Sequence, residues 1–404
     1  MAQQVGYANP YRLQHLLGRA RWDEEQVCAE VRDYVVAHLD DGAGILAVDE
    51  TSFLKRGEES VGVGRQYCGL TGQIENCQVG VFLAYISLKG QSLLDRRLYL
   101  PKSWAQDRQR RKKAHIPSKV RFATKTGLAQ GMLQSAIKAG IRPAWFVADE
   151  VYSRDASFWR WLEQTARQPY VLTVNKRQPT PINFQTCYAE DLARTVPPEG
   201  WQRLSTGAGT KGERYYDWAR VQLSCRQPEG FSRWFLLRRC PEHPDNPSFI
   251  SYYQVFAPSD TSLETMVGVA AQRWRIEECF QFAFISTGLR GLRSTLMDGL
   301  ASPHCLSLSC TSLPLGVALS SRTAGRTLNC SLFFSSGGGW LSGCVQSGPW
   351  ALVRLSLAEL RRWVWRFLFP RSWSLESILH WSFWRRHHQA LARYHHYRKR
   401  SQAP

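Results

Sequence analysis

The sequence is short of acidic residues, and it lacks the features that mark several classes of protein. Of its 404 residues, 33 are Asp or Glu and 52 are Lys or Arg, which gives a formal net charge of +19. The first residues form no apolar core like that of a signal peptide, and no charge-free apolar run is long enough to span a membrane. We therefore expect a cytoplasmic protein, neither secreted nor membrane-spanning.

Cysteines with metal-ligand spacing are also lacking. The chain has 11 cysteines, an odd number, and they are scattered without a CxxC motif. The pattern predicts neither a disulfide framework nor a structural zinc site, and it fits a reducing compartment.

The residues that are present indicate a folded protein with a polyanionic partner. A chain of 404 residues that is 44% hydrophobic can bury a full core, and this length favours two or three domains. The excess of positive charge favours a nucleic acid as the partner, ahead of an anionic membrane.

Two apolar runs stop abruptly at a carboxylate. Ile45 to Val48 leads into Asp49, and Ala144 to Ala148 leads into Asp149, while a third acid, Glu277, lies in a segment that reads as helix. Two strand-end aspartates and a helical glutamate would form an oxygen-rich site suited to Mg²⁺ or Mn²⁺. Two such ions, about 3.5–4 Å apart, can activate the attacking oxygen and stabilise the leaving oxygen of a phosphodiester. We therefore interpret Asp49, Asp149 and Glu277 as catalytic residues and as the ligands of two ions.

Each of these acids is followed by a second one, namely Glu50, Glu150 and Glu278. Because neighbouring strand residues point to opposite faces, one member of each doublet is expected to enter the site. Glu277 is preferred over Glu278 because Arg273 lies four residues earlier, on the same helical face, where it can hold a DNA phosphate.

The order of the predicted elements indicates an α/β protein with an RNase H-like, retroviral integrase-like core. Helical spacing covers 10–40 and 126–139, and strand patterns cover 44–49, 61–69, 78–88 and 144–149. Further strand patterns from about 170 to 260 predict a β insertion before the helix of Glu277. The predicted organisation is a helical N-terminal region that either contacts DNA or packs over the core (1–42), the first part of the catalytic core (43–170), the β-rich insertion (171–262), the catalytic helix (263–283), an anomalous segment (284–349) and a basic, aromatic C-terminal region (350–404).

The anomalous segment differs in composition from its surroundings. Between Glu278 and Glu359 the one acid is Asp298, lysine is absent, and four cysteines fall at 305, 310, 330 and 344. We interpret 284–349 as a frameshifted stretch, which predicts a chain that is poorly folded after 283 and inactive as encoded; a divergent native segment is the alternative.

Basic and aromatic residues outside the acids are candidates for contact with DNA. Lysines and arginines crowd the connection before the helix at 126–139, where the alternative is a solvated loop, and tryptophans of the insertion could stack on an unpaired base, where the alternative is plain core. The candidate DNA-binding residues are Arg273, Lys102, Arg110, Arg111, Lys112, Lys113 and Trp218.

Several motifs together resemble the DDE transposases of bacterial insertion sequences, in the branch that has a β insertion before the last acid. The motifs are Val48–Thr51, Gln66–Gly69, Ile74–Val81, Leu100–Trp104, Ala148–Tyr152 and Arg273–Glu278, and the resemblance covers about 10–283 and 350–400. It implies Mg²⁺-dependent cutting and strand transfer, with Asp49, Asp149 and Glu277 as the triad. Arg273 matches the arginine of the signature Y-x₂-R-x₃-E-x₆-K, but Ala270 and Phe284 stand at its tyrosine and lysine positions.

The sequence therefore predicts a DNA transposase that cuts at insertion-sequence ends and joins them to target DNA. Its expected partner is double-stranded DNA, in the form of terminal inverted repeats and target, bound by a homodimer on paired ends; bound to DNA, it would be associated with the nucleoid. Two alternatives remain open: a catalytically dead DNA-binding remnant, and a related metal-dependent nuclease without strand transfer.

Overall fold

The computed structural model describes residues 7, 9–18, 23–182, 185–209, 212–223, 227–244 and 246–287, together with scattered positions between 376 and 394. Contacts divide the chain into two compact units, Met1–Arg21 with Ser347–Pro404, and Trp22–Gln346. The division falls inside the predicted N-terminal region 1–42. The anomalous segment lies outside the described residues from 288 onward, so its interpretation as a frameshift stays a hypothesis.

The first unit contains helix α1 (Tyr11–Gly18) and helical residues between 376 and 394. Within it, the Tyr11 hydroxyl lies 2.6 Å from Nε2 of His388, and the His388 ring stacks on Trp384 with centroids 4.0 Å apart. These aromatic contacts join the two ends of the sequence.

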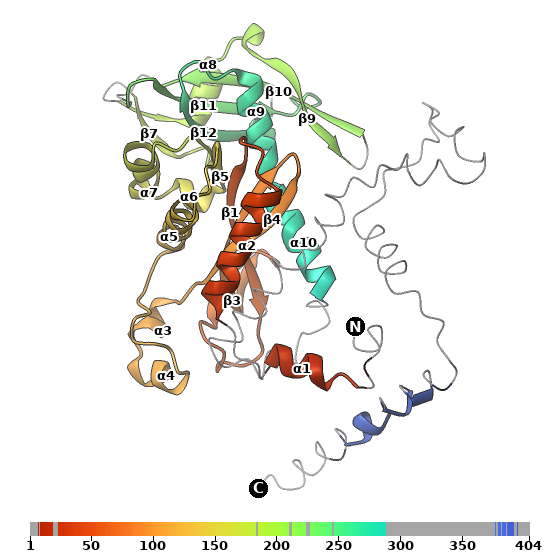
Figure 1. Ribbon diagram of the computed structural model, residues 1–404. Helices are drawn as coiled ribbons and strands as arrows, with labels where there is room; N and C mark the ends of the chain where they lie inside the picture. Colours follow the sequence, from red (N-terminus) through yellow and green to blue (C-terminus); the bar gives the residue numbers. More distant parts are fainter. Residues whose placement is uncertain are drawn as a thin grey trace, which may run out of the picture. The chain divides into compact units, whose positions relative to one another are not determined.

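The second unit is a mixed α/β structure built on one large mixed sheet (Figure 1). Its ten strands run in the order β2-β3-β1-β5-β6-β12-β11-β10-β9, with β4 paired to β3. The strands are β1 (Ile45–Leu54), β2 (Gly64–Cys68), β3 (Gln73–Ser87), β4 (Gly90–Leu98), β5 (Trp145–Ala148), β6 (Tyr170–Val174), β9 (Gln202–Gly209), β10 (Gly212–Gln222), β11 (Phe231–Arg239) and β12 (Ile250–Pro258). A separate hairpin pairs β7 (Pro179–Ile182) with β8 (Gln185–Tyr188).

The strand order is consistent with the RNase H-like core that the sequence predicts. Strand β1 pairs antiparallel with β3 and parallel with β5, which in turn pairs parallel with β6. Two details differ from the prediction. The third strand of the antiparallel part is β4, whereas the predicted strand at 61–69 is the short edge strand β2. Strand β6, assigned to the insertion, lies beside β5, and β12 pairs with it so that the insertion continues the same sheet.

Helices cover both faces of the core strands. Figure 1 shows α5 (Lys125–Lys138), α6 (Glu150–Ser153) and α7 (Ala156–Trp161) on one side and α10 (Arg275–Thr287) on the other. Helix α2 (Glu24–His38) packs in the same apolar cluster as α5, and α9 (Leu263–Gln272) in the same cluster as α10. The remaining short elements are α3 (Lys102–Gln106), α4 (Arg108–Lys113), α8 (Ala189–Thr195), a π-helical turn at Leu162–Ala166 and 3₁₀ turns at Pro198–Gly200 and Pro247–Phe249.

Alternation along β1 decides which face each side chain meets. Ile45 and Ala47 pack in the cluster with α9 and α10, whereas Leu46 and Val48 pack in the cluster with α2 and α5. The same alternation sends Asp49 toward α10 and Glu50 toward α5.

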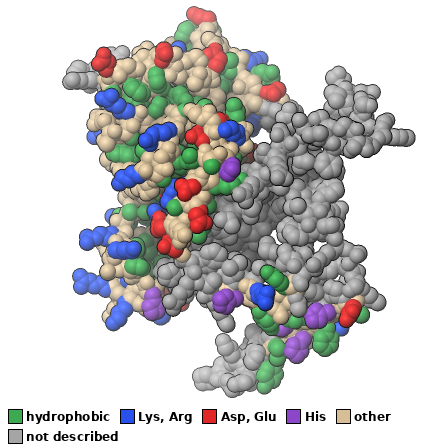
Figure 2. All heavy atoms as spheres, viewed as in Figure 1, with side chains coloured by type: hydrophobic (Ala, Val, Ile, Leu, Met, Phe, Trp, Pro, Cys, Tyr) green, Lys and Arg blue, Asp and Glu red, His purple; other side chains and the backbone are tan. Residues whose placement is uncertain are grey.

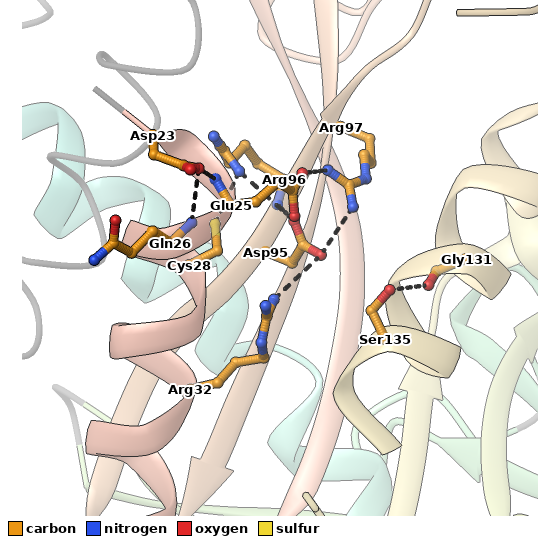
Figure 3. Close-up of polar contacts among 10 residues, drawn as sticks. All are labelled: Asp23, Glu25, Gln26, Cys28, Arg32, Asp95, Arg96, Arg97, Gly131 and Ser135. Carbon is orange, nitrogen blue, oxygen red and sulfur yellow. Dashed lines mark hydrogen bonds and ion pairs between the residues drawn. The ribbon is translucent and has the colours of Figure 1, made fainter. Parts of the chain in front are cut away.

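A buried charge cluster joins α2 to β4 (Figure 3). Asp95 of β4 is 2% exposed, and its carboxylate lies 3.9 Å from Arg32, 3.8 Å from Arg96 and 3.5 Å from Arg97. Arg96 also contacts the Cys28 sulfur at 2.8 Å, and Arg97 pairs with Glu25 at 3.0 Å. Buried charges persist in a core when they are paired in this way, and here the pairs hold α2 against the sheet.

The described helices include none with the length and apolar character required to cross a bilayer.

Candidate functional site

The register of the sheet brings Asp49 and Asp149 together. Strands β1 and β5 run parallel, and their last ladder pair is Val48 with Ala148, so the next residue of each strand is an aspartate. Asp149 caps the N-terminus of α6 by accepting the Val151 N–H at 3.0 Å. Carboxylate oxygens of Asp49, Glu50 and Asp149 all lie within 4.8 Å of one another. Two of the three predicted acids thus meet, although the expectation of two strand ends is correct for Asp149 alone: β1 continues five residues beyond Asp49, to Leu54, and it is the ladder with β5 that ends there.

Glu50 joins this oxygen cluster, although alternation directs it toward α5. One of its oxygens lies 2.5 Å from the Lys125 ammonium, and the other accepts the Tyr152 hydroxyl at 3.0 Å. Tyr152 is fully buried. One member of each doublet was expected to enter the site, but both Asp49 and Glu50 reach the oxygen cluster. Asp149 lies just after the end of β5, where it is within reach of side chains from both faces of the sheet.

Glu277 reaches the cluster through Arg273. The Arg273 guanidinium lies 3.3 Å from Asp49 and 3.1 Å from Glu277, so it bridges the two acids. The predicted contact four residues apart is therefore present. Glu277 itself is outside the group of oxygens within 4.8 Å that the described residues form.

The second members of the other doublets point to different partners. Glu278 accepts a hydrogen bond from the Gln91 amide at 3.1 Å, which ties it to β4. Glu150 contacts the Arg154 guanidinium and the Asn175 amide. These contacts of Glu278 and Glu150 agree with the choice of Glu277 and Asp149 within the two doublets. The catalytic role of Asp49, Asp149 and Glu277 remains a prediction.

Burial and crowded negative charge raise the pKa values of the two aspartates in the cluster. Burial, together with repulsion from Asp149, raises the pKa of Asp49 to about 7, although Arg273 opposes the shift. Burial, together with repulsion from Glu50, raises the pKa of Asp149 to about 6. Within the described chain, the ion pairs of Arg273 and Lys125 leave this negative charge only partly compensated.

These residues fit a divalent cation of the Mg²⁺ type. The donors are carboxylate oxygens alone, which hard cations prefer, and they lie close enough to share one ion. A dication would relieve the repulsion that raises both pKa values.

The predicted DNA-binding residues of the basic connection separate into two groups. Arg110 and Arg111 are half-buried and hold the local fold: Arg110 lies 3.7 Å over the Trp104 ring, and Arg111 donates to the carbonyl oxygens of Ala105, Pro117 and Val120. The second group has exposed side chains and consists of Lys102, Lys112 and Lys113. Of these, Lys113 pairs with Glu59. Figure 2 shows lysine and arginine side chains gathered over α3 and α4, at the lower left of the view.

Trp218 does not fit its predicted role. The side chain is 1% exposed, and its ring stacks on Tyr253 with centroids 5.9 Å apart. Both the burial and the packing mark it as a core residue of the extended sheet, so its faces are not open to a DNA base.

Lys125 and Tyr152 are site residues that the sequence did not single out. Lys125 belongs to the basic connection, and Tyr152 to the motif after Asp149, but only the packing of α5 and α6 against β1 brings them to Glu50. No spacing rule within one element signals a contact across three elements.

Comparison with known proteins supports the assignment of a family. The profile of the DDE superfamily endonucleases matches residues 1–221, which is more than half of the chain. Comparison with curated proteins gives no match. Among solved structures, the chain is similar to a piggyBac transposase in a synaptic complex with hairpin DNA, at 11% identity and a TM-score of 0.34, over 72% of this chain and 56% of that one. The chain thus spans little more than half of that transposase, and the family profile carries the assignment: the chain belongs to the DDE superfamily endonucleases.

Proposed function

We propose that the chain is a DNA transposase that cuts at the ends of an insertion sequence and joins them to target DNA. The observation that carries the proposal is the parallel pairing of β1 and β5, because Asp49 in the middle of β1 lies beside Asp149, which directly follows the end of β5. The membership of the DDE superfamily endonucleases supports the reaction class.

In this proposal Asp49, Asp149 and Glu277 hold two Mg²⁺ or Mn²⁺ ions. The ions would supply an activated oxygen nucleophile and stabilise the leaving oxygen. The protein's own residues fix the geometry: the β1–β5 ladder sets the spacing of the aspartates, and Val151 N–H orients Asp149. Arg273, which lies between Asp49 and Glu277, is placed to hold a phosphate of the strand at the site.

The substrate in this proposal is double-stranded DNA, comprising the terminal inverted repeats and the target, held by a homodimer on paired ends. The formal net charge of +19 and the exposed lysines of α3 and α4 favour a polyanion. Water would serve as the first nucleophile and the freed 3′ hydroxyl as the second, so one site would perform both steps.

The test uses the purified chain and a plasmid that carries the DNA flanking its gene. With Mg²⁺ or Mn²⁺ we expect nicks at the element ends followed by joined products, and EDTA should abolish both. Nicks without joined products would identify a nuclease that lacks strand transfer. Salt-sensitive DNA binding without any cleavage would identify a remnant that binds DNA.

A further inference from the structure

Lys125 places a positive charge directly beside the oxygen cluster. It is the first residue of α5, whose N-terminus is capped by Thr124 accepting the Gly127 N–H at 3.1 Å. The start of the helix is therefore fixed, and the side chain extends toward β1, where its ammonium meets Glu50 at 2.5 Å.

The partner of Lys125 is itself held in place. Glu50 receives the hydroxyl of the fully buried Tyr152 on its other oxygen, so the carboxylate is clamped between α5 and α6. Lys125 thus lies at the same oxygen cluster as the two aspartates, because Glu50 belongs to that cluster.

The ammonium has capacity for a further acceptor. A lysine ammonium carries three donors, and Glu50 takes one in the contacts that the structure describes. The Lys125 side chain is 22% exposed, so part of it faces solvent beside the cluster.

We propose that Lys125 binds a phosphate of the DNA strand at the Asp49–Asp149 cluster, while Glu50 and Tyr152 position its ammonium. The ligand class is a phosphodiester group, recognised by charge and not by base. This inference rests on the proposed function, because it requires DNA to reach the cluster.

The experiment measures how the affinity for DNA depends on salt. A fluorescent 30-base-pair duplex of arbitrary sequence is titrated in Ca²⁺ at several KCl concentrations, with the full chain and with Lys125→Gln. One lost phosphate contact should reduce the slope of log K against log salt by about 1, with roughly tenfold weaker binding at low salt. Lys125→Arg should restore most of the slope and most of the affinity for DNA.

Two matched variants separate this role from a structural one. Lys138 lies exposed at the opposite end of the same helix, so Lys138→Gln should leave the slope unchanged. Glu50→Gln removes the ion pair that positions the ammonium but keeps its positive charge, so it should weaken DNA binding less than Lys125→Gln does and reduce the salt slope less. If Lys125 served only as the partner of Glu50, Lys125→Gln and Glu50→Gln would behave alike.

The outcomes distinguish this inference from the proposed function. Wild-type chain that binds DNA, with Lys125→Gln matching Lys138→Gln in slope and affinity, would overturn the role of Lys125 and leave the proposed function standing. Wild-type chain that does not bind the duplex at low salt would overturn both.

Discussion

Two buried acidic clusters on the same sheet have opposite charge balances. At Asp95, one carboxylate lies within 4 Å of three arginines, Arg32, Arg96 and Arg97. At Asp49, Glu50 and Asp149, three carboxylates crowd together, and the ion pairs described there come from Arg273 and Lys125. Both clusters lie where strands meet helices, and in both the burial of aspartate raises its pKa.

The difference is one of available positive charge. Three arginines surround the single carboxylate of Asp95, and their ion pairs hold α2 on β4. The cluster at Asp49 keeps its repulsion, a cost that a bound cation would offset. We therefore propose charge imbalance, and not burial or acidity alone, as the feature that marks the cluster at Asp49 as the candidate site.

The largest expected effect is on catalysis. Asp149→Asn keeps the shape of the side chain but removes a charged ligand, and the rate of metal-dependent plasmid nicking should drop at least about 1,000-fold. Asp49→Asn should reduce the rate of nicking to a similar extent. Binding to a 30-base-pair duplex, measured by anisotropy, should stay within about threefold, because phosphate contacts supply most of the affinity. Nicking by Asp149→Asn at the wild-type rate would contradict the assignment.

The next effect is on stability, and here the Asp95 cluster dominates. Asp95→Ala leaves buried guanidinium groups without their carboxylate, and the free energy of unfolding should fall by about 3–5 kcal/mol. Urea denaturation measures this change. Asp49→Asn is the matched comparison, because it removes repulsion and should stabilise the protein; equal losses in both variants would mean that the two clusters do not differ as described.

Several of the strands that the sequence predicted contain uninterrupted apolar runs. β1, β3 and β5 are of this kind, and their burial on both faces explains why the runs are continuous. β4 was missed because Asp95, Arg96 and Arg97 lie inside it, and charged residues in a row are typical of a loop. Asp95 and Arg96 are nevertheless buried, because α2, distant in the sequence, packs over them and brings Arg32 to Asp95.

The site was predictable where an apolar run stops on an acid, even though β1 itself continues past Asp49, and it was not predictable where it depends on contacts between elements. Asp49 and Asp149 follow from apolar runs that stop on an acid, and parallel pairing places them together. The contact of Arg273 with Glu277 follows from their spacing of four residues, although the single helix predicted over 263–283 is interrupted and Arg273 lies in the turn between α9 and α10. The roles of Glu50 and Lys125 depend on how α5 packs on β1, and the burial of Trp218 depends on how the insertion extends the sheet; neither is encoded in a local pattern.

A pH series sharpens the comparison further. The pKa of Asp49 is raised to about 7 from its ordinary value of 3.8, so the folded state keeps a proton that the unfolded chain has lost. Stability contributed by this protonated form is full below about pH 4 and is lost as the pH rises through 7. In EDTA, the free energy of unfolding should therefore fall as the pH rises through this window. Asp49→Asn should make that fall smaller by about 1–2 kcal/mol. Thermal unfolding at pH 5 and pH 8 checks this; a wild-type pH slope in Asp49→Asn would contradict the raised pKa.

The smallest expected effects concern the basic connection. Lys112→Gln should reduce the salt slope of DNA binding by about 1 and change stability by less than about 0.5 kcal/mol, because its side chain is exposed. Arg111→Gln should instead lower stability by about 1 kcal/mol, because it removes the hydrogen bonds to the carbonyl oxygens of Ala105, Pro117 and Val120. Anisotropy and urea denaturation on both variants test this division, and a reversed pattern would assign the DNA contact to Arg111.

The central claim is that Asp49 and Asp149 form a divalent-cation site, and calorimetric titration with Mn²⁺ at pH 8 tests it most directly. The wild-type chain should bind Mn²⁺, and Asp149→Asn should weaken that binding at least about tenfold. Glu150→Gln is the matched control, because Glu150 is the neighbouring acid and contacts Arg154 and Asn175 instead of the cluster; it should bind Mn²⁺ as the wild type does. Equal Mn²⁺ affinities for Asp149→Asn and Glu150→Gln, or no binding by the wild type, would contradict the account.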